Sequence, residues 1–183
     1  MGKELEVKVL NINKDEIIKK LESINAKLIK REHQVNKIFD FEDRYIKDSH
    51  KGYMRIREKI DLLRDKKEYI LTLKKNVSND GVRENIEIET NVTDSGSLEK
   101  ILLHLKLKKV HQGSKERISY TLDGILFEID TWDKDTYPEP YLEIEVKDKK
   151  ELDRAIKILD LKKDNVTSKS IGQLRMEKGL SDL

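Results

Sequence analysis

The sequence has no cysteine and only two prolines among its 183 residues, and it has no long apolar run. Without cysteine, the chain cannot form disulfide bonds, a thiolate zinc site or a cysteine nucleophile. Because no run of about 18 apolar residues occurs, neither a membrane-spanning helix nor a membrane partner is expected. The first residues also lack the apolar stretch of a signal peptide. These absences favour a protein of the cytoplasm.

The sequence also has no recognisable interdomain linker and no large excess of positive or negative charge. Both prolines lie within residues 137–141, and no low-complexity tract interrupts the chain, so we predict a single domain over residues 1–183. The 38 basic residues nearly balance the 36 acidic residues, which leaves a net charge of +2. Nucleic-acid-binding proteins usually carry a clear basic excess, so no nucleic-acid partner is expected.

Charge itself is abundant, at 40% of the residues against about 25% in an average soluble protein. Residues of two kinds alternate along seven segments, which is the period of a strand with two different faces, and residues 35–41 form a further apolar and aromatic segment. The predicted strands are residues 4–10, 35–41, 53–59, 68–75, 82–90, 115–122, 125–131 and 141–147. The turn sequences Asn79-Asp80-Gly81 and Asp123-Gly124 indicate hairpins, and therefore antiparallel pairing.

Helical spacing of apolar residues separates some of these strands. Helices are predicted after a cap at Asn13, over residues 94–105 and 148–159, and from residue 167 or 168 onward. We therefore predict an α+β fold: an eight-stranded antiparallel β-barrel, closed or nearly closed, with peripheral helices.

Pairs of like charge stand two residues apart within the strands. Side chains at this spacing share one face and lie roughly 7 Å apart along the chain. Such faces could simply point to water, as in many antiparallel sheets. However, the charged faces are nearly pure and are sorted by sign from strand to strand, so we favour a charged barrel interior. The pairs are Glu4 and Glu6, Arg55 and Arg57, Glu87 and Glu89, Lys115 and Arg117, and Glu143 and Glu145.

A charged interior has to be hydrated and its charges matched, because each unpaired buried ion costs several kcal/mol. The predicted inward bases are Lys8, Arg55, Arg57, Lys74, Arg83, Lys115, Arg117 and Lys169. The predicted inward acids are Glu4, Glu6, Glu87, Glu89, Asp130, Glu143 and Glu145. With two divalent cations this lining reaches about +5, which a triphosphate of about −4 to −5 would balance. Arginine and lysine suit phosphate oxygens, and carboxylate pairs suit Mg²⁺ or Mn²⁺.

The order of these charges resembles that of a known family. Glu4-Leu5-Glu6-Val7-Lys8 is similar to the ExExK signature of the CYTH superfamily, also called triphosphate tunnel metalloenzymes. The resemblance spans roughly residues 3–175. It continues through Arg55-Ile56-Arg57, Leu73-Lys74, Arg83 before Glu87-Ile88-Glu89, Lys115-Glu116-Arg117, Phe127-Glu128-Ile129-Asp130, Leu142-Glu143-Ile144-Glu145 and Lys169-Ser170.

The resemblance implies an eight-stranded tunnel and a role for each matching residue. Metal ligands would be Glu4, Glu6, Glu143 and Glu145, with Asp130 helping at a second Mg²⁺ or Mn²⁺. Triphosphate would be bound by Arg55, Arg57, Lys74, Arg83, Lys115, Arg117 and Lys169. Lys8 would lie near the reacting phosphate, which makes Lys8, Glu4 and Glu6 the catalytic candidates. Glu87 and Glu89 would support basic partners or a metal.

Two reactions are compatible with these metal-binding and triphosphate-binding residues. Water attack on the γ-phosphorus would make the protein a triphosphatase, acting on inorganic triphosphate, a nucleoside triphosphate or thiamine triphosphate. Attack of a ribose 3′-hydroxyl on the α-phosphorus would make it a class IV adenylate cyclase, which produces cyclic AMP and pyrophosphate. We favour the triphosphatase because hydrolysis needs only a bound triphosphate and a water.

A non-catalytic binder of triphosphate or polyphosphate is a third possibility, but it would not need the acidic residues. In each case the partner is a small-molecule triphosphate, and the protein is expected to be a monomer or homodimer. The four histidines show no spacing for a metal site or a triad, and Trp132 is expected to pack at the rim of the tunnel rather than to stack against a base.

Overall fold

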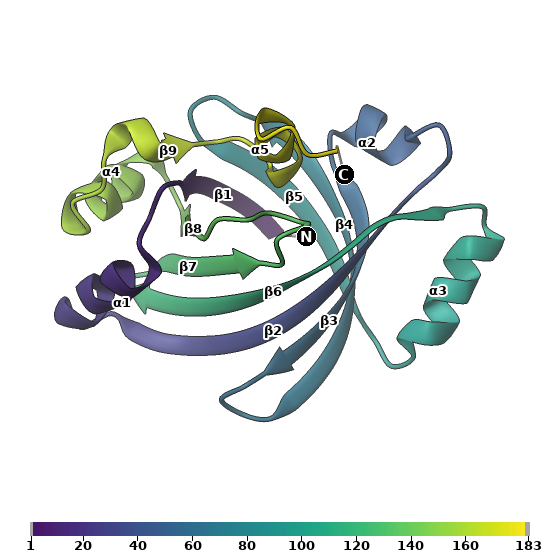
Figure 1. The fold of residues 1–183 in the computed structure, drawn as a ribbon, viewed down its shortest axis with the longest axis horizontal. Helices are drawn as coiled ribbons and strands as arrows, with labels where there is room; N and C mark the ends of the chain where they lie inside the picture. The colour runs from purple at the N-terminus through teal and green to yellow at the C-terminus, as the bar shows by residue number, and fades with distance from the viewer. Residues whose placement is uncertain (1, 182–183) are drawn as a thin grey trace.

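The computed structural model describes residues 2–181, with the side chains of residues 2–4 outside that description. Its sheet consists of long antiparallel strands that curve around a central space (Figure 1). The strands are β1 (Gly2–Val9), β2 (Lys27–Asp40), β3 (Tyr53–Asp61), β4 (Lys66–Ser78), β5 (Arg83–Val92), β6 (Lys108–Leu122), β7 (Ile125–Trp132), β8 (Tyr141–Val146) and β9 (Val166–Thr167).

The sheet closes on itself. Its strand order is β5-β4-β3-β2-β6-β7-β8-β1, and β1 pairs with β5 as well as with β8. The two-residue β9 adds to β1 beside the barrel. The predicted α+β fold with a closed eight-stranded antiparallel barrel is therefore confirmed.

Within residues 2–181, five helices lie around the barrel, and capping side chains fix where most of them begin. They are α1 (Lys14–Ser23), α2 (Tyr45–His50), α3 (Ser95–His104), α4 (Lys149–Ile158) and α5 (Ile171–Glu177), with a 3₁₀ turn η1 at Lys163–Asn165. The side chains of Asn13, Asp94 and Asp148 accept hydrogen bonds from backbone N–H groups of α1, α3 and α4, which stabilises each helix by about 1 kcal/mol. The last helix begins later than expected, at Ile171, because Ser170 and Gln173 form a capping box there.

The sequence pattern missed two parts of the fold. The first half of β2 and the first half of β6 lack regular alternation, yet they pair with each other from Lys27–Thr121 to Asp40–Lys108. This long-range pairing, rather than local pattern, extends both strands. The short helix α2 was not predicted either. Its start is stabilised by Asp40, whose carboxylate accepts hydrogen bonds from the N–H groups of Ile46 and Lys47.

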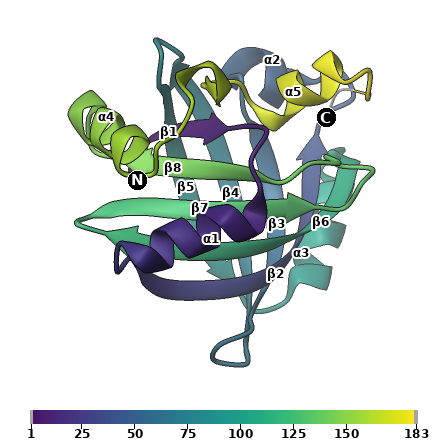
Figure 2. The same ribbon diagram turned by 60° about the vertical axis from the view of Figure 1, so that its left-hand side comes forward.

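Apolar side chains of the strands face outward, and the largest core cluster lies outside the barrel. Val7 and Val9 of β1 pack there with Ile17 and Leu21 of α1 and with Leu159 after α4. Figure 2 shows α1 lying over the strands near β6 and β7. A smaller cluster joins Phe39 and Ile56 to α2 and α3. Since the apolar faces are used outside, the polar faces of the same strands line the interior. In the described part of the chain, no helix has the length and apolar character needed to cross a membrane.

Candidate functional site

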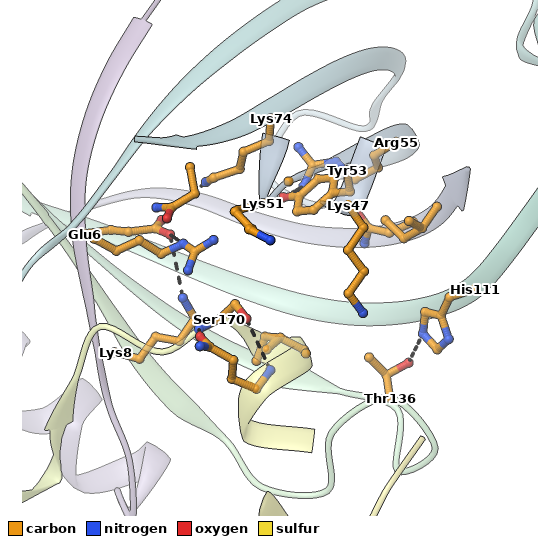
Figure 3. A pocket seen from close by; sticks show the side chains of 18 of the residues that line it. Glu6, Lys8, Lys47, Lys51, Tyr53, Arg55, Lys74, His111, Thr136 and Ser170 are labelled. Atoms are coloured by element: carbon orange, nitrogen blue, oxygen red, sulfur yellow. Dashed lines mark hydrogen bonds and ion pairs between the residues drawn. The ribbon is translucent and has the colours of Figure 1, made fainter. Parts of the chain in front are cut away.

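The barrel interior holds a cavity of about 430 Å³, within the range of ligand pockets. Among the described side chains, ten basic and seven acidic ones line it, so this part of its wall carries a net positive charge. Eleven of the fifteen predicted site residues are brought together there: Glu6, Lys8, Arg55, Arg57, Lys74, Arg83, Glu87, Lys115, Arg117, Glu143 and Glu145. Figure 3 shows Glu6, Lys8, Lys74 and Arg55 around this space.

Glu6 of β1 is the centre of the acidic part of the wall. Its carboxylate lies 3.7 Å from Lys8 Nζ, 3.5 Å from Lys74 Nζ and 3.8 Å from Arg83 Nε. It also accepts a 3.0 Å hydrogen bond from Asn85 Nδ2. Burial alone raises the pKa of Glu6, but Lys8, Lys74, a hydrogen bond with Glu143, and Arg83 hold that pKa well below its usual range. Glu6 is therefore ionised at neutral pH.

Glu87 and Glu143 complete this acidic part. Glu87 of β5 is 2.8 Å from Lys74 Nζ. Burial raises the pKa of Glu87, but Lys74 and Arg55 lower it to about 2. Glu143 of β8 lies opposite Lys8 in the sheet and 3.8 Å from its Nζ. We call Glu6, Glu87 and Glu143 the carboxylate wall.

Asp130 of β7 is fully buried behind the cavity rather than lining it. Its carboxylate accepts hydrogen bonds of 2.6 Å from Lys115 Nζ and Arg117 Nε, and one of 3.0 Å from the Tyr141 hydroxyl. Trp132 Nε1 in turn donates to that hydroxyl at 2.9 Å. In this arrangement Asp130 orients two cations, whereas the sequence placed it as a ligand of a second metal.

Lys115 and Arg57 show how crowded the cations are. Burial, then repulsion from Arg117, lowers the pKa of Lys115 to about 7, although Asp130 opposes this. Burial, with repulsion from Arg55 and Arg117, lowers the pKa of Arg57 to about 10. A lowered pKa of a base means that its positive charge is unfavourable where it stands. A bound anion would relieve this cost.

Arg55, Arg57 and Asn36 form the opposite side, on β2 and β3, which we call the donor wall. Arg57 Nε donates to Asn36 Oδ1 at 2.9 Å. Arg55 donates to the Tyr53 hydroxyl at 3.1 Å and to Thr72 Oγ1 at 3.2 Å. These bonds hold both guanidinium groups inside the barrel.

Three other predicted site residues are not seen in the cavity lining. Lys169 is exposed and its ammonium pairs with Glu177 of α5. The side chain of Glu89 is 43% exposed and accepts a 2.8 Å hydrogen bond from Thr72 Oγ1 on the barrel wall. The backbone of Glu4 belongs to β1, but its side chain lies outside the described residues, so its assignment as a metal ligand stays a prediction.

Several lining residues were missed by reasoning from the sequence. Arg44, Lys47 and Lys51, in and around α2, add three basic side chains to the cavity. Figure 3 shows Lys47 and Lys51 extending into it. No period-two pattern marks them, because they stand on a short helix and its flanking residues. His111 also lines the cavity, and its Nε2 lies 3.0 Å from Thr136 Oγ1.

The carboxylate wall offers a divalent cation too few protein oxygens for a complete coordination shell, so a bound phosphate or water would have to supply the rest. Within residues 5–181, no group of three or more histidine and carboxylate side chains is arranged to hold a metal by itself. Glu6 and Glu143, however, are in side-chain contact. Mg²⁺ typically takes one or two carboxylates and completes its coordination with waters and substrate phosphates. The two glutamates match this donor set.

Residues 2–171 match the family model described as the CYTH domain. The chain belongs to the CYTH domain family. The match covers β1 to β9, so it includes every strand of the barrel. No match to this chain was found among curated proteins.

Solved structures share the CYTH fold. The PH1819 protein of Pyrococcus horikoshii is 23% identical with a TM-score of 0.78, and the alignment covers 96% of this chain and 99% of that one. A putative adenylate cyclase of Vibrio parahaemolyticus is 15% identical with a TM-score of 0.71, covering 94% and 97%. A putative adenylyl cyclase of Hippeastrum with a dominant triphosphatase activity is 14% identical with a TM-score of 0.67, covering 98% and 97%.

Proposed function

We propose that this CYTH chain is a divalent-metal-dependent triphosphatase that hydrolyses a small-molecule triphosphate by water attack on the γ-phosphorus. The observation that carries the proposal is the cavity, in which ten basic side chains face a group of carboxylates. Phosphoryl transfer depends on positioning and charge neutralisation more than on covalent catalysis, and this lining supplies both.

The basic residues would bind the triphosphate in different ways, according to their positions in the cavity. Arg55 and Arg57 offer planar guanidinium groups to phosphate oxygens, while Lys74 supplies a point charge beside Glu6 and Glu87. Lys8 is buried, and its ammonium lies between the carboxylates of Glu6 and Glu143. This position supports a role in which Lys8 would neutralise charge on the reacting phosphate, next to the proposed metal ligands.

Glu6 and Glu143 would hold Mg²⁺ or Mn²⁺, with Glu145 nearby on the same strand and Glu4 as a further predicted ligand. Asp130, which the sequence suggested as a ligand too, would instead hold Lys115 and Arg117 in position. When bound, such an ion neutralises phosphate charge and lowers the pKa of a coordinated water. The contact between the two side chains supports this assignment, because one divalent cation can take both carboxylates as ligands.

A class IV adenylate cyclase is the second candidate. Apolar and aromatic side chains also line the cavity, among them Ile38, Trp132 and Met176, and these would accommodate an organic group. The related folds include proteins named as putative adenylate cyclases and one with a dominant triphosphatase activity. Hydrolysis remains our choice because it requires only the triphosphate-binding part of the cavity.

The test is incubation with inorganic tripolyphosphate, ATP and thiamine triphosphate, each with Mg²⁺, Mn²⁺ or EDTA, with separation of the products. We expect orthophosphate and the corresponding diphosphate, with no turnover in EDTA. Cyclic AMP and pyrophosphate from ATP would instead establish the cyclase. Binding of a triphosphate without any product would establish a non-catalytic binder. The Glu6→Gln variant, purified in parallel, controls for contaminating phosphatases.

A further inference from the structure

Asn36 is a buried residue whose side-chain amide has an unused donor. Asn36 is one of the residues that line the cavity, and 2% of its surface is exposed. In the described part of the chain, four buried side-chain atoms have no hydrogen-bond partner, and Asn36 Nδ2 and Arg55 Nε are two of them. Both atoms are donors, and both belong to residues of the donor wall that line the cavity. Unpaired buried donors are rare in folded proteins, so two of them on neighbouring residues of the cavity lining call for an explanation, and a bound acceptor is one.

The orientation of the Asn36 amide follows from its neighbour. Arg57 Nε–H donates to Asn36 Oδ1 at 2.9 Å. Turning the amide over would set its NH₂ against this N–H, donor against donor, so the carbonyl must face Arg57. On the other side, the residue paired with Asn36 in β6 is Gly113, which has no side chain to accept from Nδ2.

A second asparagine–arginine pair shows what the complete arrangement looks like. Arg83 Nε donates to Asn85 Oδ1 at 3.2 Å, as Arg57 does to Asn36. Asn85 then donates its own Nδ2 to Glu6 at 3.0 Å. Asn85 is therefore satisfied within the protein, and it does not line the cavity. At Asn36, the corresponding donor has no protein acceptor, and Asn36 itself is one of the residues that line the cavity.

We propose that Asn36 is a substrate-binding residue that donates an Nδ2 hydrogen bond to a phosphate oxygen while its carbonyl orients Arg57. This inference rests on the proposed function, since it takes the ligand of the cavity to be a triphosphate. Phosphate oxygens are strong acceptors, which matches the two unpaired donors of Asn36 and Arg55. A neutral amide also adds a hydrogen bond without adding charge beside Arg55, Arg57 and Arg117, which already repel one another.

The experiment is a double-mutant cycle on the dissociation constant of inorganic tripolyphosphate, measured by calorimetry in EDTA. The proteins are the wild type, Asn36→Ala, Arg57→Met and the double variant. We expect Asn36→Ala to weaken binding about tenfold, both in the wild type and in the Arg57→Met background. An effect of threefold or more in that background supports direct contact. A smaller effect means that Asn36 acts only through Arg57 and overturns the proposal.

Two further variants protect the test. Asn91→Ala, at an exposed asparagine of β5, is the matched control and should bind like the wild type. Asn36→Leu keeps the size of the side chain and its neutrality but loses the donor, so it carries the test, again in both backgrounds, if Asn36→Ala fails to fold. Unchanged affinity of Asn36→Leu in the Arg57→Met background would overturn the proposal. If the wild type itself does not bind tripolyphosphate, the proposed function fails and this inference falls with it. Binding by the wild type with equal binding by the Asn36 variants rejects the inference alone.

Discussion

The carboxylate wall and the donor wall face the same cavity but are balanced differently. Glu6, Glu87 and Glu143 each contact at least one cation, so the protein itself matches these charges. On the donor wall, Asn36 and Arg55 each hold an unpaired donor, and the pKa of Arg57 is lowered by burial and by neighbouring cations. The charges of the carboxylate wall are therefore paired within the protein. The donor wall has unpaired donors and crowded cations, and we expect an anion to bind there.

This difference separates two ways of using buried charge. Pairs on the carboxylate wall fix the positions of Lys8 and Lys74 and gather ligands suited to a cation. Unpaired donors on the donor wall cost stability in the free protein, and phosphate oxygens that accepted from them would offset this cost. Variants of the first wall should therefore impair turnover, and variants of the second should impair binding.

The largest effect is expected at Glu6. Glu6→Gln keeps the shape but removes the charge that three cations share, and it removes a proposed metal ligand. We expect kcat for tripolyphosphate with Mg²⁺ to fall about 100-fold or more. Glu116→Gln, at an exposed glutamate of β6, is the matched control and should keep wild-type activity. A kcat for Glu6→Gln within threefold of wild type would contradict the claim that the carboxylate wall acts in turnover.

A smaller effect of a different kind is expected at Arg55. Arg55→Ala removes an unpaired donor and a buried positive charge from the donor wall. We expect KM to rise about 30-fold, with a clearly smaller change in kcat, because the lost contact is made with bound substrate as well as in the transition state. Steady-state kinetics on tripolyphosphate measures both values. A fall in kcat at constant KM would show that Arg55 acts in the chemical step instead.

The smallest effect concerns stability. Because its folded-state pKa is lowered to about 2, Glu87 stabilises the protein above its unfolded pKa near 4.5, and this contribution is lost as pH falls from about 4.5 toward 2. Between pH 6 and pH 3.5, the wild type should lose about 1 kcal/mol more unfolding free energy than Glu87→Gln. Urea unfolding at the two pH values measures this. Equal losses would show that the Lys74–Glu87 pair does not stabilise the fold.

The alternation of residues along the strands predicted which residues line the cavity better than it predicted where the strands begin and end. Alternation depends only on local sequence, so it correctly placed Glu6, Lys8, Arg55 and Arg57 inside the barrel. It does not tell a lining residue from one buried behind the lining, which is why Asp130 was expected in the cavity. That distinction depends on Lys115, Arg117 and Tyr141, which all bond to Asp130.

Other features depend on contacts distant in sequence. The exposed position of Lys169 is set by α5, whose Glu177 pairs with it. Lys47 and Lys51 reach the cavity because α2 is positioned over the barrel by Asp40 and the cluster around Ile46. The sequence did not predict Asn36, because a neutral residue does not mark a charged strand face, and its unused donor follows only from its hydrogen bonds in the folded protein.

The most direct test of the central claim is hydrolysis of inorganic tripolyphosphate with Mg²⁺ in ¹⁸O-labelled water. Attack of water on a terminal phosphorus places one ¹⁸O in the released orthophosphate and none in the pyrophosphate, and mass spectrometry of the two products reads this out. The account predicts that pattern for the wild type and its loss in Glu6→Gln. Label in the pyrophosphate, or no release with either Mg²⁺ or Mn²⁺, would contradict it.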